Sequence, residues 1–139
     1  MPKLSIAVTH SLFFSLFRAD PAVFFRTSCG SWAVARAECQ AGGGDLVVIT
    51  DATKNEQVKK FMQSFSDYGT CRGPYPWIGG HKCAGSTCTW VDGSPWNPAA
   101  GIEPNSYSEP GLHLYTSGKW GTHTLSSTAI GLCERQGEG

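Results

Sequence analysis

Oxygen-bearing side chains gather in one stretch of the chain, at Glu103, Asn105 and Glu109. A glutamate carboxylate only accepts hydrogen bonds, whereas an asparagine amide both donates and accepts them. The pair Glu103 and Asn105 therefore complements hydroxyl groups, which also do both. Oxygen atoms of this kind are the ligands that Ca²⁺ prefers. The chemistry that these residues could perform is the binding of a hydroxyl-rich ligand, with or without calcium.

Catalysis is a less favoured use of the same residue types. Glu103 and Glu109 could form the carboxylate pair of a glycosidase, but both lie on one long loop. His113 and His123 could act as bases, but no serine or cysteine nucleophile is placed persuasively beside them. We therefore expect a recognition module rather than an enzyme.

Six cysteines in a short chain are typical of a disulfide-bonded protein from an oxidising compartment. Cys83 and Cys88 bracket a short segment suited to a hairpin turn, and we expect them to form a disulfide. A zinc site made of these cysteines with His81 and His123 matches zinc by ligand type, but its spacing matches no familiar set. A disulfide between the two cysteines would remove it. We expect a secreted or extracellular protein.

The composition indicates one domain and excludes two classes of partner. The chain has 139 residues, of which 40% are hydrophobic and 12% aromatic, enough for one packed core. The 11 basic residues balance the 11 acidic ones, and no basic stripe is present, so we expect no nucleic-acid partner. No apolar run reaches the roughly 20 residues that span a bilayer, so we expect no membrane span.

Residues 1–26 form an N-terminal segment that has two interpretations. Lys3 precedes a mostly apolar stretch that ends at Phe17, as in a weak signal peptide, but the following residues make a poor cleavage site. The alternative is a hydrophobic first strand. On either interpretation, we expect the domain at residues 27–135 and a short tail at residues 136–139.

Two helices are predicted in the first half of the domain. Ser31 can cap a helix over residues 32–39, and the glycines at 42–44 can end it. Leu46 to Ile49 predict a short strand. Thr50 or Asp51 then caps a second helix, whose apolar face carries Val58, Phe61, Met62 and Phe65.

Short strands and one long loop are predicted in the second half. The strand-like segments are residues 77–79, 89–91, 112–115, 119–120 and 129–133. Residues 93–111 form a loop rich in Gly, Pro, Asn and Ser, and long loops of this kind are usually functional. Two helices packed on short antiparallel strands, with a long ligand-binding loop, make an α+β fold.

Five tryptophans are a heavy aromatic content for one domain, and most are expected in the core. Trp96 lies nearest the long loop. It is the best candidate for stacking on a ligand, although a structural role is favoured for it as well.

Six short motifs, in order, resemble those of the C-type lectin-like domain family. They are W-x-x-A-x-x-x-C at 32–39, G-G-x-L-x-x-I at 43–49, W-I-G at 77–79, W-x-D-G at 90–93, E-P-N at 103–105 and C-E at 133–134. Together they span most of residues 27–135. The resemblance implies a C-type lectin-like fold.

The resemblance also implies a disulfide between Cys39 and Cys133, which would join the first helix to the last strand. The family's inner bridge would fall at Gly111 and Leu125, and neither position is a cysteine. Both halves of that bridge are therefore missing together. Cys29 and Cys71 are left over, and whether they pair with each other stays open.

In sugar-binding members of the family, loop side chains hold Ca²⁺ and two sugar hydroxyls at once. The resemblance gives this role to Glu103, Asn105 and Glu109. It identifies Pro104 as the family's cis-proline, which would aim the flanking side chains the same way. The order E-P-N implies mannose-type rather than galactose-type ligands.

The chain departs from the family pattern directly after Trp120. The family continues with Asn-Asp, and both are calcium ligands, whereas this chain has Gly121 and Thr122. Glycine offers no side chain, and Thr122 offers only a neutral hydroxyl. Because calcium sites tune affinity through their charge, the affinity for calcium should be weakened.

We therefore predict a carbohydrate-binding module with weak calcium-dependent recognition of mannose-type glycans or glycoproteins. The alternative is a C-type lectin-like domain that binds a protein partner without calcium or sugar. Calcium-dependent retention on a mannose resin would discriminate between the two.

Overall fold

The computed structural model describes residues 22–68, 71, 73–98 and 102–137, so the signal-peptide interpretation of residues 1–21 lies outside the described residues. Two helices and seven strands follow one another along this part of the chain. They are β1 (Ala22–Arg26), α2 (Trp32–Ala41), β2 (Asp45–Leu46), α3 (Ala52–Gln63), β3 (Gly80–Ala84), β4 (Thr87–Trp90), β5 (Gly111–Leu114), β6 (Trp120–His123) and β7 (Leu132–Gln136).

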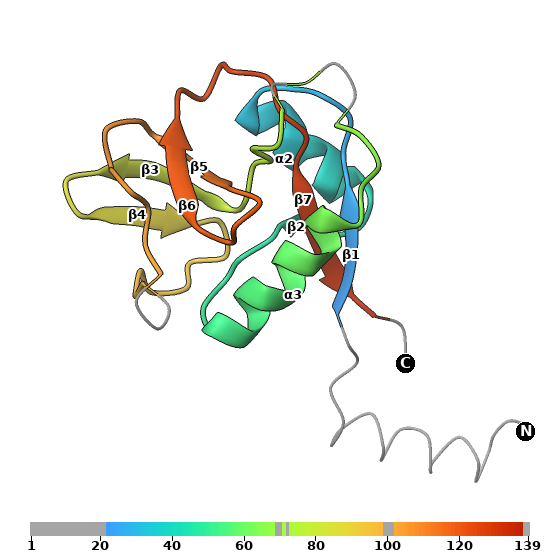
Figure 1. The fold of residues 1–139 in the computed structure, drawn as a ribbon, viewed down its shortest axis with the longest axis horizontal. Helices are drawn as coiled ribbons and strands as arrows, with labels where there is room; N and C mark the ends of the chain where they lie inside the picture. Colours follow the sequence, from blue (N-terminus) through green and yellow to red (C-terminus); the bar gives the residue numbers. More distant parts are fainter. Residues whose placement is uncertain (1–21, 69–70, 72, 99–101, 138–139) are drawn as a thin grey trace, which may run out of the picture.

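The strands form three small antiparallel sheets, which makes the predicted α+β architecture correct. One sheet has the order β1-β7-β2, and the other two are the hairpins β3–β4 and β5–β6. Figure 1 shows both hairpins on one side of the molecule, with the three-stranded sheet and the helix α2 on the other. The hairpin side carries the long loop and is where the candidate site lies.

Strand β1 places residues 22–26 inside the sheet, with Phe25 opposite Cys133 in the antiparallel register. The sequence pattern assigns residues 22–26 to the N-terminal segment, and the apolar stretch that ends at Phe17, for which a first strand is the alternative, lies outside the described residues. At the other end, β7 extends to Gln136, which the sequence pattern assigns to the tail.

Both predicted helix caps are confirmed. The backbone N–H of Val34 donates to the Ser31 hydroxyl at the start of α2, and that of Lys54 donates to Asp51 at the start of α3. The buried face of α2 consists of Trp32, Ala35 and Cys39. The buried face of α3 consists of Asn55, Val58 and Met62, whereas the predicted Phe61 and Phe65 are only partly buried.

The strand predicted from Leu46 to Ile49 is mostly wrong, because only Leu46 of that segment lies in β2. The remaining residues are buried but change partners. The N–H of Val47 donates to Leu132, and that of Val48 donates to the carboxylate of Glu134 at 3.0 Å. A side chain therefore replaces the next rung of the ladder and ends the strand.

Trp77 connects the hairpins to the three-stranded sheet. Its side chain is fully buried, and its backbone forms isolated bridges with His113 in β5 and with Gly131 just before β7. Its indole N–H donates to the carbonyl of Gly30 at 3.2 Å. The predicted strand at residues 77–79 is therefore a single junction residue rather than a regular strand.

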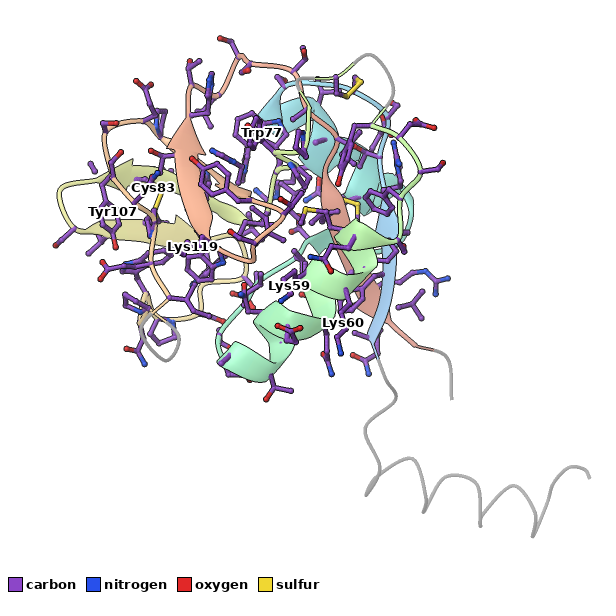
Figure 2. All side chains as sticks on the ribbon, in the orientation of Figure 1. Lys59, Lys60, Trp77, Cys83, Tyr107 and Lys119 are labelled. Atoms are coloured by element: carbon purple, nitrogen blue, oxygen red, sulfur yellow. A yellow bond between two sulfur atoms is a disulfide. The ribbon has the colours of Figure 1, made fainter. Side chains whose placement is uncertain are left out.

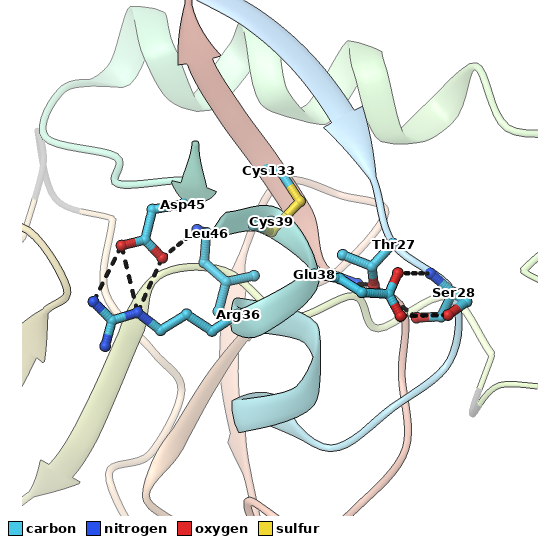
Figure 3. Close-up of a disulfide and its surroundings, with 9 residues drawn as sticks. Thr27, Ser28, Arg36, Glu38, Cys39, Asp45, Leu46 and Cys133 are labelled. Atoms are coloured by element: carbon cyan, nitrogen blue, oxygen red, sulfur yellow. Dashed lines mark hydrogen bonds and ion pairs between the residues drawn. A yellow bond between two sulfur atoms is a disulfide. The ribbon is translucent and has the colours of Figure 1, made fainter. Parts of the chain in front are cut away.

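All six cysteines are paired, as Cys39–Cys133, Cys83–Cys88 and Cys29–Cys71. The first two pairs confirm the predictions, and the third resolves the pairing that the sequence leaves open. Figure 3 shows the Cys39–Cys133 bridge between α2 and β7, flanked by the Arg36–Asp45 ion pair and the Glu38–Ser28 hydrogen bonds. The zinc alternative loses both of its cysteine ligands.

Among the residues placed in the structure, no helix combines the length and the apolar character needed to cross a bilayer.

Candidate functional site

The E-P-N residues lie along the edge of strand β6. Pro104 is buried and forms a parallel bridge with Trp120, and the N–H of Asn105 donates to the carbonyl of Trp120 at 3.2 Å. These contacts fix this part of the long loop against the β5–β6 hairpin. Glu103 and Asn105, on either side of the buried proline, are exposed.

The prediction of a cis-proline at position 104 is wrong, because the described residues contain no cis peptide bond. The flanking side chains have different partners. The hydroxyl of Tyr107 donates to Oε1 of Glu103 at 3.1 Å, and Nδ2 of Asn105 donates to the hydroxyl of Tyr115 at 3.4 Å.

A cavity of about 810 Å³ opens between the long loop, the turn after β5 and the helix α3. We call it the loop cavity. Its polar and aromatic walls include Glu103, Asn105, Tyr107, Tyr115, Ser117 and Lys119. Figure 2 labels Tyr107 and Lys119 on the hairpin side of the molecule.

The base of the loop cavity is held by a buried polar pair. The indole N–H of Trp120 donates to Oδ1 of Asn55 at 2.9 Å, and Nδ2 of Asn55 donates to the carbonyl of Gly118 at 2.8 Å. Trp120 is 1% exposed and Asn55 6%. One side chain from α3 thus fixes both the indole ring and the turn that carries Lys119.

Electrostatics favour a protonated hydroxyl at Tyr107. Burial raises the pKa of Tyr107 above its usual 10, and the neighbouring carboxylate of Glu103 also raises it, while the side chain of Trp96 acts in the opposite direction. Tyr107 therefore donates to Glu103 at neutral pH and orients that carboxylate. The second oxygen of the carboxylate is left to accept a hydrogen bond from a ligand.

Glu109 and Thr122 lie apart from the walls of the loop cavity. The backbone N–H of Glu109 donates to Oγ1 of Thr122 at 3.4 Å, and that hydroxyl donates to the carbonyl of Ser106 at 3.3 Å. Thr122 therefore braces the long loop from β6. Glu103 and Asn105 line one cavity, whereas Glu109 and Thr122 lie behind its wall residue Ser106 and do not line it.

The oxygen-bearing side chains at this site do not form a complete set of calcium ligands. Ca²⁺ takes about six to eight oxygen ligands, and the described residues contain no group of three or more His, Cys, Asp or Glu side chains that could hold a metal. The Thr122 hydroxyl already serves two backbone groups. The space beside Gly121 is filled, since a Cβ atom there would lie 2.6 Å from the hydroxyl of Tyr115 and 2.8 Å from Nε2 of His113.

The two positions of the missing inner disulfide are neighbours in space. A Cβ atom at Gly111 would lie 3.0 Å from Cδ2 of Leu125. The alignment of these positions with the family pattern is therefore consistent with the fold. A leucine contact against the backbone of β5 takes the place of a covalent brace.

Trp96 packs among other rings instead of lining the loop cavity. Its ring centroid lies 5.3 Å from that of Trp90, 5.9 Å from that of Trp120 and 6.1 Å from that of Tyr107. It supports Tyr107 from the core side. The wall residues Tyr107, Tyr115 and Lys119 were not predicted, because no motif in the sequence brings them to Glu103 and Asn105.

The family profile described as the lectin C-type domain matches residues 29–135. A curated relative, the hepatic lectin of Gallus gallus, is 25% identical over 118 residues, which are 81% of this chain and 53% of the relative. The chain spans about half the length of the curated relatives that it matches.

Solved structures share the fold at low identity. The C-type lectin domain of murine dendritic cell inhibitory receptor 2 in complex with N-glycan superposes with a TM-score of 0.67 and 21% identity, covering 84% of this chain and 91% of that one. A calcium-independent type II antifreeze protein superposes with a TM-score of 0.62 and 20% identity, covering 83% and 86%.

Proposed function

The chain belongs to the C-type lectin domain family, and on this premise we propose that it recognises mannose-type glycans through the loop cavity. It is a binding domain and not an enzyme, in keeping with the lectins and antifreeze proteins that it matches. The observation that carries the proposal is the pairing of Glu103 and Asn105 in the wall of one cavity. The three disulfides fit a protein that acts outside the cell.

The walls of the loop cavity suit a sugar ring. Glu103 accepts hydrogen bonds from hydroxyls, and the amide of Asn105 can accept them and donate them. Tyr107 and Tyr115 add aromatic surface for the apolar C–H groups of the ring. Lys119 is exposed at the turn after β5 and supplies a further donor. A few placed polar groups among aromatic walls are typical of small-ligand sites.

The preference for mannose-type ligands rests on the E-P-N order at residues 103–105. The structurally similar murine receptor domain was solved with an N-glycan, which supports a glycan as the ligand class.

Calcium is expected to contribute weakly. Any calcium effect would involve Glu103, Asn105, Glu109 and Thr122, and only the first two of these line the loop cavity. Direct hydrogen bonds from Glu103 and Asn105 are therefore the main source of affinity in this proposal. Calcium should increase sugar affinity only at millimolar concentrations.

Isothermal titration of the purified protein with methyl mannoside tests the proposal, in chelator and in millimolar calcium. We expect binding in both conditions, and we expect Glu103→Gln and Asn105→Ala to weaken it about tenfold or more. Glu56→Gln, at an exposed glutamate on α3, is the matched control and should bind like the wild type. Absence of methyl mannoside binding in both conditions would refute the proposal.

A protein partner is the second candidate, favoured by the incomplete calcium site at Gly121 and Thr122. The same loop would then serve as a protein interface without sugar. A calcium-independent antifreeze protein has a similar fold, so thermal hysteresis of the protein should be measured as well. If Glu103→Gln kept full thermal hysteresis, ice binding would be independent of the residue that we assign to glycan binding.

A further inference from the structure

A second, smaller cavity lies next to the loop cavity and shares Tyr115 with it. Its volume is about 220 Å³, and its walls are Tyr75, His113, Tyr115, Thr122 and His123. We call it the tyrosine–histidine pocket. None of the motifs in the sequence points to it, and its residues come from β5, the turn after β5, β6 and the segment before Trp77.

The rings of this pocket brace one another edge to face. The ring centroids of Tyr75 and Tyr115 are 5.4 Å apart at 85°, and those of His113 and Tyr115 are 4.9 Å apart at 74°. His113 is only 3% exposed, while the two tyrosines and His123 are partly exposed. The pocket therefore has a buried imidazole at its base and partly open aromatic walls, which T-shaped contacts hold in place.

The packing of Tyr115 and His113 in this pocket requires a glycine at position 121. A Cβ atom there would lie 2.6 Å from the hydroxyl of Tyr115 and 2.8 Å from Nε2 of His113, both closer than real Cβ contacts. The residue that removes a calcium ligand therefore also makes room for the two rings. The loss of one kind of site and the presence of the other have a single structural cause.

The chemistry of the pocket matches a sugar unit better than a metal ion. The backbone N–H of Thr124 donates to Nδ1 of His123 at 3.0 Å, which leaves Nε2 as the ring nitrogen that can donate to a ligand. Tyr115 supplies a hydroxyl and an aromatic surface. The ring centroids of His113 and His123 are 6.4 Å apart, and no group of three metal-binding side chains occurs among the described residues.

We propose that the tyrosine–histidine pocket is a second sugar subsite, so that the ligand is an oligosaccharide of two or more units that passes over Tyr115. The inference rests on the proposed function, because the loop cavity takes the first unit. The volume of the tyrosine–histidine pocket is below the roughly 300–1,000 Å³ of pockets for drug-sized ligands, and this small size suits a single sugar ring. Tyr115 joins the two subsites, since its hydroxyl also accepts from Asn105.

A chain-length series tests the inference on the wild-type protein. Calorimetric titration with methyl mannoside, mannobiose and mannotriose should show about a tenfold gain in affinity from one unit to two. His123→Ala should remove this gain and leave the monosaccharide affinity unchanged. Tyr75→Leu should also remove the gain through loss of an aromatic wall, but only His123→Ala is expected to leave the monosaccharide affinity unchanged, because Tyr75 braces the loop-cavity residue Tyr115. Ser126→Ala, an exposed change outside the pocket, is the control and should keep the gain.

The possible failures are distinguishable. If the monosaccharide binds but the disaccharide binds no tighter, the second subsite is refuted and the proposed function stands. If His123→Ala weakens both ligands equally, the residue acts on the loop cavity or the fold, and the subsite is again refuted. If no member of the series binds, the proposed function and the subsite are both refuted.

Discussion

The phenolic oxygen of Tyr115 occupies the space that a side chain at Gly121 would need, since a Cβ atom there would lie 2.6 Å from it. In the family pattern that position carries an asparagine that binds calcium. Here the side chain is absent and the ring of Tyr115 lies against the backbone of β6. The calcium site cannot be rebuilt by restoring one side chain while that ring stays in place.

Restoring the family residue should therefore damage the fold without restoring calcium binding. We expect Gly121→Asn to lower the free energy of unfolding by about 1–3 kcal/mol, because the added atoms displace Tyr115 and His113. Urea denaturation and calcium titration check the two halves of the prediction. As a matched comparison, Gly121→Ala should lower the free energy of unfolding more than Gly73→Ala does. A Cβ atom at exposed Gly73 meets nothing within 4 Å. A stable Gly121→Asn protein with tight calcium binding would contradict this account.

Asn55 is expected to stabilise the base of the loop cavity. Asn55→Ala leaves the indole N–H of Trp120 and the carbonyl of Gly118 without their partner in a buried place. We expect a loss of about 2–3 kcal/mol in the free energy of unfolding, together with weaker sugar binding. Gln57→Ala, on the exposed side of α3, should stay within about 0.5 kcal/mol of the wild type. Equal stability of the two variants would show that the buried pair contributes little.

The three disulfides should differ in their contribution according to the length of chain that each closes. Cys39–Cys133 spans a sequence separation of 94 residues, and Cys83–Cys88 spans 5. In the chain-entropy model, replacing both cysteines by alanine should cost about 4.7 kcal/mol for the first pair and about 2 kcal/mol for the second. Guanidinium denaturation of the two double variants measures the difference. A larger loss for the short bridge would contradict the entropic explanation.

Stability should fall as the pH drops below about 6.5, in part because of His81. Burial lowers the pKa of His81 below its usual 6.5, and the positive charges of Lys82 and Arg36 lower it further, while Asp45 acts in the opposite direction. The imidazole stacks on the ring of Trp32 with a centroid distance of 4.4 Å. Because the folded pKa is the lower one, the unfolded chain binds more protons below the unfolded value, and protonation favours unfolding.

The pH effect is measured by comparing His81→Gln with the wild type. The Tm of the wild type should fall more than that of the variant between about pH 7.5 and about pH 5.5. A proton NMR titration of the His81 ring should show a midpoint below 6.5. A midpoint above 6.5, or parallel Tm curves for the two proteins, would exclude this role.

Much of the scaffold could be predicted because its signals are local. Ser31 and Asp51 cap the helices through bonds to residues three positions later, and this spacing is visible in the sequence. The motifs identified the family and its Cys39–Cys133 bridge. The pairing of Cys83 with Cys88 followed from the short turn between them. The boundaries of β1 and β2 were less predictable, since they depend on pairing with β7 far along the chain.

The sequence by itself determined the fold family and the disulfide-rich character, and it predicted hydroxyl binding by Glu103 and Asn105. Only the tertiary structure decided what surrounds them. It placed Tyr107 and Tyr115 beside that pair, kept the peptide before Pro104 trans and filled the space at Gly121 with rings. These features depend on which distant residues meet when the loop folds onto the hairpin, and neither residue type nor spacing specifies that meeting.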